Sequence, residues 1–230
     1  MRPTFTAPPD CVEVLAAECR ALAAAVLSLP EEDFARGTRC PPWDVKALLA
    51  HVWRGIDRII VYTAEPAPER IDSDAIAYFR GGYDPVTDAA DVAARGLEVA
   101  DRFATGADLA RDFDERSRRI ADVARSMTAG RAVRTFGPCL RLDEYVCTRV
   151  LEVAVHGLDL ADALGRDPWL TPGGAALVRS MLVAMLGAEP PEALGWDDAA
   201  FFETGTGRRR TSAEERRILG PLADELPLLS

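Results

Sequence analysis

Lysine and histidine are scarce in this 230-residue chain. Lys46 is its only lysine, and His51 and His156 are its only two histidines. The 37 acidic residues outnumber the 27 lysines and arginines, which gives a formal net charge of −10. Binding to a phosphate backbone or to an anionic membrane surface requires a basic footprint on the protein. We therefore expect neither nucleic acid nor a membrane among the partners.

Signals for disulfide pairing and for export are also missing. The five cysteines are an odd number, and no Cys-x-x-Cys occurs, so we expect reduced thiols. Residues 1–10 lack a basic segment followed by an apolar one, and no apolar run approaches the roughly 20 residues of a membrane span. Hydrophobic residues nevertheless make up 48% of the chain, which is enough for a sizeable core. These features predict a soluble, cytoplasmic protein.

Several catalytic motifs are absent as well. The chain has no His-Glu-x-x-His, the usual zinc protease pattern, and no pair of Glu-x-x-His segments of the kind that holds a di-iron centre. It also lacks Gly-x-Ser-x-Gly, a Walker phosphate loop and the Rossmann glycine fingerprint. These absences exclude the commonest protease, hydrolase, nucleotide-binding and di-iron assignments.

Helical periodicity runs through almost the whole chain. Apolar residues spaced three, four or seven apart predict long helices over 11–29, 44–62, 88–127 and 142–164, the third interrupted near Thr105. Asp44 is the expected N-cap of the second helix, and Gly165 is expected to end the fourth. We therefore predict a mainly α fold, with a four-helix bundle over residues 1–168 and a small C-terminal extension over 169–230.

The remaining segments are shorter and richer in turn residues. A proline-punctuated connection over 64–85 is expected to contain a short helix near 74–80, and connections of this length often form walls or lids of sites. Residues 129–138 are predicted to form a turn region. In the extension we predict a helix over 171–186, a turn-rich basic patch over 205–210 and a short last helix opened by a capping box of Ser212 and Glu215.

One stripe of the helix over 142–164 is polar at every position. Tyr145, Arg149, Glu152, His156 and Asp159 follow one another in steps of four and three, so they share one face. The other faces are apolar or small, which indicates a helix buried on most of its circumference. An unpaired buried charge is expensive, so this stripe is expected to face polar partners, water or a metal ion.

Glu152 and His156 are candidate metal ligands because residues four apart on a helix meet on one face. A carboxylate and an imidazole suit a borderline divalent ion. His51, inside the helix over 44–62, is the candidate third ligand, and Gly55 leaves space beside it. Three protein ligands leave a coordination position open, as catalytic sites require. The alternative is an ordinary hydrogen-bonded Glu–His pair and a core histidine, which are both common in helices.

Two segments resemble the mycothiol-dependent maleylpyruvate isomerase family. The segment from Cys40 through Pro-Pro-Trp-Asp-Val-Lys to His51 is similar to the opening metal segment of the family. The segment over 149–161, with Glu152 and His156, resembles the second metal segment, and the tail from Thr204 looks like the end of short members. Asp44 stands where the family usually has a hydroxyl cap, and Pro42 stands where it usually has glycine.

The resemblance implies a DinB-like four-helix bundle, a divalent metal usually taken as zinc, and a low-molecular-weight thiol, mycothiol, as cosubstrate. It places the metal on His51, Glu152 and His156. It also implies an arginine from the C-terminal part near the substrate, for which Arg208 is the candidate. Three nitrogen or oxygen ligands do not by themselves distinguish zinc from nickel, manganese or iron.

Other polar residues near this pattern are candidates for binding substrate. Arg149 and Arg58 are candidates for an anionic group, and Tyr83 for the pocket wall. For Arg149 the alternative is a salt bridge to Glu152, three residues further along the helix. Trp43 either lines the pocket or belongs to the ordinary core. Asp159 is expected either to orient His156 through a hydrogen bond or to face water beyond the site.

Two function hypotheses follow. In the first, the protein is a metal-dependent enzyme that activates mycothiol as a thiolate for transfer to a small electrophile, or for its cis–trans isomerisation. In the second, it is a non-catalytic metal-binding or ligand-binding helical bundle. The sequence names neither the electrophile nor the oligomeric state, for which a homodimer is one arrangement that it allows.

Overall fold

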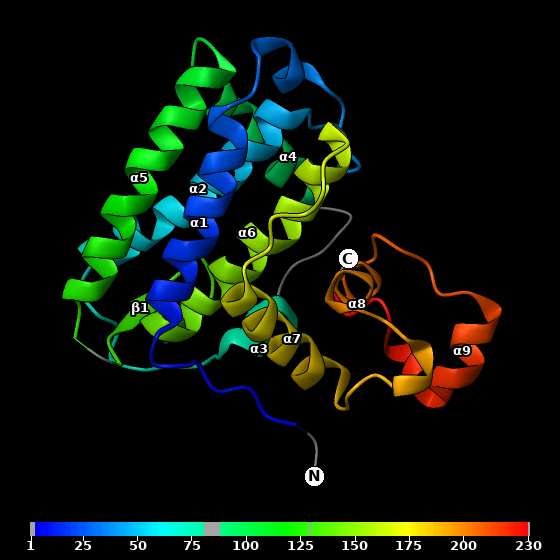
Figure 1. The fold of residues 1–230 in the computed structure, drawn as a ribbon. Helices are drawn as coiled ribbons and strands as arrows, with labels where there is room; N and C mark the ends of the chain where they lie inside the picture. The colour runs from blue at the N-terminus through cyan, green and yellow to red at the C-terminus, as the bar shows by residue number, and fades with distance from the viewer. Residues whose placement is uncertain (1–2, 81–87, 129, 230) are drawn as a thin grey trace.

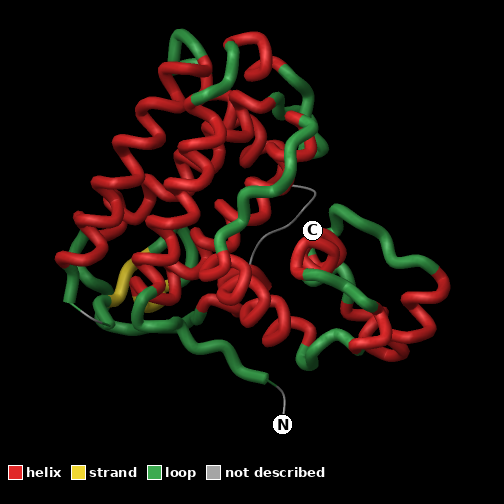
Figure 2. The backbone as a smooth tube through the Cα atoms, viewed as in Figure 1, coloured by secondary structure: helices red, strands yellow, loops and turns green. Residues whose placement is uncertain are grey.

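The computed structural model describes residues 3–80, 88–128 and 130–229 and is mainly helical (Figures 1 and 2). None of the described helices combines the length and apolar character needed to cross a bilayer. The elements are, in order, α1 (Cys11–Leu27), η1 (Glu31–Ala35), α2 (Val45–Ala64), α3 (Ala75–Arg80), α4 (Asp88–Ala100), α5 (Gly106–Ser126), β1 (Ala132–Arg134), β2 (Cys139–Arg141), α6 (Leu142–Leu164), α7 (Pro172–Leu186), η2 (Glu192–Leu194), α8 (Asp198–Gly205), α9 (Ala213–Leu219) and η3 (Gly220–Glu225).

Four long helices form the bundle predicted from the sequence. α1 and α2 each pack against both α5 and α6, and α4 covers α2 (Figure 1). α6 is the most buried of these helices, because most of its 23 residues lie in the interior. Its polar stripe therefore sits inside the bundle rather than on the surface.

Local capping signals place the helix ends where the sequence predicts them. The Asp44 carboxylate accepts a hydrogen bond from the Ala47 amide at the start of α2. The predicted break in the third region is real, because Thr105 and Asp108 form a capping box that opens α5. α6 ends at Gly165, which adopts the left-handed conformation with φ of 63°.

A small β-hairpin replaces part of the turn region predicted over 129–138. β1 and β2 pair in antiparallel register, with Val133 opposite Leu140. Strands of three residues are too short to show an alternating pattern, so periodicity does not reveal them. The hairpin leads directly into α6 and thereby fixes where that helix begins.

The C-terminal part leans on one end of the bundle. α7 packs against α6 and α1, and α8 packs against α7 and α6. Figure 1 shows α8 and α9, in orange and red, beside the bundle rather than within it. α8 is a helix that the sequence reading does not predict, although Asp197 caps it by accepting from the Ala200 amide. The capping box of Ser212 and Glu215 opens α9 as predicted.

Candidate metal centre

The facing sides of α2 and α6 bring three candidate ligands together. The Glu152 Oε2 atom lies 3.6 Å from His51 Nε2 and 3.4 Å from His156 Nε2. The two imidazole rings meet edge to face, with centroids 5.0 Å apart. On the other side of His51, the indole of Trp43 stacks at 4.5 Å between centroids. The stacked indole and the edge-on ring fix the orientation of the His51 imidazole.

The spacing of these three groups fits a bound divalent cation. Their ligand atoms all lie within 4.8 Å of one another. Two ligands on a tetrahedral zinc, each about 2.0–2.1 Å from the metal, are separated by about 3.3 Å. The distances from Glu152 to the two imidazoles are close to that value. Both are longer than a normal hydrogen bond.

The site is accessible although its walls are buried. The side chains of His51, Glu152 and His156 are 20%, 24% and 11% exposed, whereas residues next to them on α6 are buried. Each of the three side chains therefore keeps a small part of its surface in contact with solvent.

Burial and neighbouring charges set the protonation of the triad. Burial lowers the pKa of His51, which favours the neutral imidazole that binds metals. Burial also opposes the charged form of His156, but its hydrogen bond with Asp159, the nearby Cys40 and the charge of Glu152 raise its pKa well above the ordinary value. Burial would raise the pKa of Glu152, yet the two histidines and the nearby arginine Arg149 hold it well below the usual range. The carboxylate is therefore ionised.

Asp159 orients His156. Its Oδ2 atom lies 2.9 Å from His156 Nδ1, so the Nε2 atom of the ring points toward Glu152 and His51. Asp159 is fully buried, which rules out the alternative that it faces water. Burial disfavours its charge, but hydrogen bonds with His156 and Arg208 lower its pKa far below the ordinary value. A carboxylate behind a ligating histidine commonly fixes the tautomer and strengthens the ligand.

Two arginines complete the shell of Asp159. Arg208 donates from Nε to Oδ1 and from Nη2 to Oδ2, both at 2.7 Å, and Arg39 donates from Nε to Oδ1 at 2.7 Å. Arg39 also pairs with Glu203 of α8 at 2.8 Å. The loop before α2 and the C-terminal part therefore meet at one buried carboxylate, next to the candidate metal ligands.

A second set of possible ligands, formed by Cys40, His156 and Asp159, is a poorer metal site. The Cys40 Sγ atom lies 3.2 Å from Asp159 Oδ2. Both oxygens of Asp159 already accept from guanidinium groups, and a cation placed there would be repelled by two permanent positive charges. Cys40 therefore belongs to the hydrogen-bonded shell of Asp159.

Comparison with known proteins gives the family. The model of the mycothiol maleylpyruvate isomerase N-terminal domain matches residues 15–161, which include His51, Glu152 and His156. The chain belongs to this family. It is also similar to two Mycobacterium tuberculosis proteins, uncharacterized protein MT0041 of strain CDC 1551 / Oshkosh and uncharacterized protein Rv0036c of strain ATCC 25618 / H37Rv. Each is 28% identical over 159 residues, which are 69% of this chain and 58% of the relative.

The matched stretch thus spans only a little over half the length of these curated relatives. No solved structure matches the chain. The family match ends at residue 161, before the C-terminal part that supplies Arg208 and Glu203. These two contacts to the shell of Asp159 therefore lie outside the matched domain.

The remaining residues that the sequence predicts for the site lie in several different environments. Arg149 forms no ion pair with Glu152 or with any other described acid. Arg208, the candidate substrate arginine, donates two hydrogen bonds to Asp159. Trp43 is a core residue that also contacts the site through His51. Tyr83 lies outside the described residues.

Two residues that the structure places around Asp159 were not predicted from the sequence. Arg39 lies in the loop before α2 and Glu203 lies in α8, and neither position has a helical stripe that marks it as inward-facing. Arg39 stands immediately before Cys40, where the segment that resembles the family begins. That neighbourhood was the only signal available for it.

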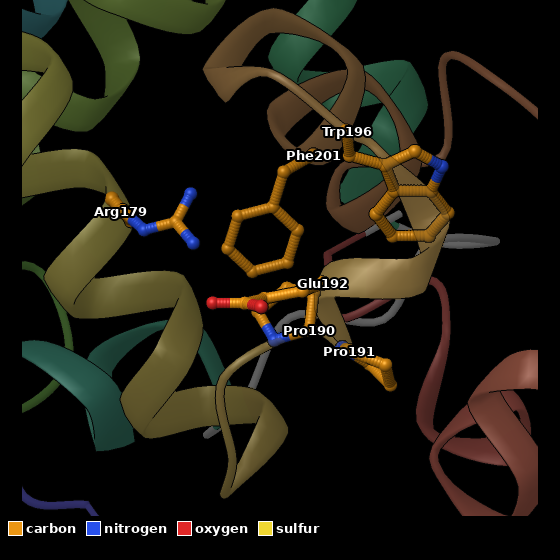
Figure 3. Close-up of a pocket in the computed structure, with 6 residues that line it drawn as sticks. All are labelled: Arg179, Pro190, Pro191, Glu192, Trp196 and Phe201. Carbon is orange, nitrogen blue, oxygen red and sulfur yellow. The ribbon is translucent and has the colours of Figure 1, made fainter.

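A cavity in the C-terminal part is separate from this site. It has a volume of about 200 Å³ and is lined by Arg179 of α7, Phe201 of α8 and the intervening Pro190, Pro191, Glu192 and Trp196 (Figure 3). The Arg179 guanidinium lies 5.5 Å from the centre of the Phe201 ring and pairs with Asp198 and Glu189. The charge of Arg179 is already balanced by these two acids. This cavity is therefore a weaker candidate for a functional site than the facing sides of α2 and α6.

Proposed function

We propose that the protein is a metal-dependent enzyme that uses a low-molecular-weight thiol, mycothiol, to transform a small electrophile. The observation that carries the proposal is the set formed by His51, Glu152 and His156, which has ligand-like spacing and partly exposed side chains. Membership of the mycothiol maleylpyruvate isomerase family supports the thiol. Zinc is the metal that we propose, since its tetrahedral geometry suits two imidazoles and one carboxylate.

The three candidate ligands and Asp159 each have a definite role in this proposal. His51 would supply a neutral nitrogen ligand, His156 would supply another once the incoming metal displaces its Nε2 proton, and Glu152 would supply an anionic oxygen. A divalent ion held by them would lower the pKa of a thiol at the open coordination position, so that the nucleophilic thiolate forms near neutral pH. Asp159 keeps the proton of His156 on Nδ1, which leaves Nε2 free to act as a ligand.

Two reactions are compatible with such a thiolate. In an isomerisation, the thiolate sulfur adds to an activated double bond, the resulting single bond rotates, and elimination restores the double bond and releases the thiolate. In a transfer, the sulfur displaces a leaving group, which departs with the bonding electron pair, and the carbon–sulfur bond remains. In both reactions the thiol proton is lost before attack.

We also propose that residues 1–168 form the DinB-like metal-binding bundle and that 169–230 form an extension that completes it. The contacts of Arg208 and Glu203 support this division of roles, since both come from the extension and reach the shell of Asp159. The extension would then hold the orientation of His156.

The test begins with the purified protein and its His51→Ala variant. The metal content of each is measured after purification without chelators and after reconstitution with zinc. Thiolate absorbance is then followed on titration with mycothiol, and the mixtures are incubated with activated alkenes, epoxides and alkyl halides. We expect about one zinc per chain, thiolate formation and conversion of at least one electrophile class, all lost in the variant.

Metal binding without thiolate formation would instead support a non-catalytic metal-binding bundle. Absence of metal binding would remove the basis of both the enzyme and the thiol proposals. Nickel, manganese and iron are compared with zinc in the same assay, because the ligand set alone does not select among them.

A further inference from the structure

Arg149 is a buried cation that forms no ion pair with a described acid, although the charge of Glu152, three residues along α6, acts on it at longer range. The residue is only 7% exposed, and its guanidinium makes one hydrogen bond among the described residues, from Nε to Thr148 Oγ1 at 3.1 Å. No described carboxylate pairs with it. Its Nη1 and Nη2 atoms make no hydrogen bond there either, yet neither is completely sealed from solvent. Since arginine stays protonated in proteins, the fold retains an unpaired charge that is costly to bury.

Aromatic rings hold this guanidinium in place. Its carbon lies 4.9 Å from the centre of the Tyr145 ring and 5.5 Å from that of Tyr78 on α3. Gly55 on α2 allows the close approach, because a Cβ atom there would lie 3.3 Å from Arg149 Nη1. The predicted space beside Gly55 is thus filled by Arg149. The side chain is fixed by packing while its outer hydrogen-bond donors remain unused.

Arg149 lies next to the candidate metal centre. α2 and α6 run antiparallel here, so that His51 faces Glu152, Gly55 faces Arg149 and the Tyr62 ring contacts the ring of Tyr145 at 5.4 Å. Gly55 follows His51 by four residues, which is about 6 Å along the helix axis. Arg149 and Gly55 therefore lie about one helical turn away from the candidate metal ligands.

Neighbouring arginines strengthen the positive potential around Arg149. Arg54 and Arg58 lie on the same side of α2 as His51, and neither forms an ion pair with a described acid. The pKa of Arg54 is lowered by burial and by the nearby charges of Arg58 and Arg95. This concentration of unbalanced arginines is unusual in a chain with a net charge of −10. Such a local field attracts anions.

From these observations we infer that Arg149 binds an anionic group of the substrate, about one helical turn from the reacting atom at the metal centre. The favoured group is a carboxylate, because the planar guanidinium fork matches two carboxylate oxygens. A phosphoryl group offers the same oxygen chemistry. The inference rests on the proposed function for the identity of the reacting atom, but the anion site itself is defined by Arg149, Gly55 and Tyr78.

Binding to metal-free protein tests the inference separately from the metal centre. Calorimetric titrations use fumarate, its uncharged analogue fumaramide, and inorganic phosphate. The proteins are the wild type, Arg149→Met, Arg149→Lys and the matched control Arg118→Met, which removes an exposed arginine paired with Asp114 on α5. We expect fumarate to bind about 10- to 100-fold more weakly to Arg149→Met than to the wild type. Arg149→Lys should lose less, and Arg118→Met should bind normally.

The thermal midpoint of the wild type gives a second readout that needs no variant. Fumarate should raise it and fumaramide should not, because only the charged ligand pairs with Arg149. If phosphate binds more tightly than fumarate, the anion site stands and the favoured group is phosphoryl. Equal binding of fumarate and fumaramide, or unchanged fumarate affinity in Arg149→Met, would overturn the inference.

Zinc uptake measured on the same proteins separates the two proposals. Arg149→Met should still bind zinc, since all three ligands remain. A wild type that binds zinc but no anion would refute the anion site and leave the metal proposal in place. A wild type that binds fumarate through Arg149 but takes up no zinc would support the anion site and refute the metal proposal.

Discussion

The polar stripe of α6 is satisfied at one end and unsatisfied at the other. At one end, Asp159 is fully buried and accepts from Arg39, Arg208 and His156 at 2.7–2.9 Å. At the other end, Arg149 is almost as buried but has no acidic partner among the described residues. Between them, Glu152 lies too far from both imidazoles for normal hydrogen bonds.

This difference separates structural charge from functional charge on one helix. A buried ion surrounded by short hydrogen bonds holds the fold and its neighbours in place. A buried ion without such partners destabilises the free protein and is retained at sites that bind something. By this criterion Asp159 positions His156, whereas in the function that we propose Glu152 binds a cation and Arg149 binds an anion.

Removing the charge of Asp159 is expected to have the largest effect on stability. Asp159→Asn leaves two guanidinium groups facing a neutral amide in a buried site, which should lower the free energy of unfolding by about 3–5 kcal/mol. Urea unfolding of the metal-free protein measures this loss. The control Glu203→Gln affects a partly exposed contact of Arg39 and should cost less than about 1 kcal/mol. Equal losses in the two variants would contradict the special role of Asp159.

The middle of the stripe is tested by metal affinity. His51→Ala should weaken zinc binding by more than about 100-fold, because losing a direct ligand should exceed the 10- to 100-fold cost of losing a supporting contact. Cys40→Ser should change zinc affinity by less than about 3-fold if the thiol only contacts Asp159. Competition with a chromogenic chelator gives both values. A large effect of Cys40→Ser would show that the alternative ligand set binds the metal.

The two ends of the stripe should respond oppositely to loss of an arginine. Arg208→Met removes charge-assisted hydrogen bonds to Asp159 and should lower the free energy of unfolding by about 2 kcal/mol. Arg149→Met replaces an unpaired buried charge with an apolar chain, which should be neutral or stabilising. Thermal and urea unfolding at one pH compare the two. A similar loss in both variants would show that Arg149 has a hidden structural partner.

Glu18, another buried acid, extends the comparison through its effect on the pH dependence of stability. Glu18 accepts from the amide and hydroxyl of Thr171, which are uncharged donors, and burial raises its pKa. A raised native pKa favours folding of the protonated form. Its contribution is therefore complete below the unfolded value of about 4.3 and is lost as the pH rises through the native value.

Glu18→Gln should remove this pH dependence. The stability of the variant relative to the wild type should rise between about pH 4 and pH 8. Denaturant unfolding across that range measures the difference. The lowered pKa of Asp159 has the opposite sign, so its contribution is present above about pH 3.9 and declines as the pH falls. A flat difference for Glu18→Gln would mean that its carboxyl titrates normally in the folded protein.

Much of the fold could be predicted from the sequence because it depends on local signals. Helical periodicity and the caps at Asp44, Thr105 and Gly165 are encoded within a few residues of each helix end. The hairpin β1–β2 could not be predicted in this way, since three-residue strands have no readable period. α8 was also missed, although Asp197 caps its start.

The candidate site was predictable to the extent that it follows one helix face. The steps of four and three along α6 placed Arg149, Glu152, His156 and Asp159 together, and the scarcity of histidine singled out His51. The contacts of Arg39, Glu203 and Arg208 with the Asp159 shell depend on how loops and the C-terminal part fold back. Such long-range pairings leave no pattern in a single sequence.

The central claim is that His51, Glu152 and His156 share one divalent ion with a vacant position. Anomalous diffraction from crystals of the zinc-reconstituted protein, collected on both sides of the zinc absorption edge, tests it most directly. The account predicts one strong anomalous peak within bonding distance, about 2.0–2.2 Å, of His51 Nε2, His156 Nε2 and a Glu152 oxygen. A peak coordinated by Cys40 and Asp159 instead, or no peak between α2 and α6, would contradict it.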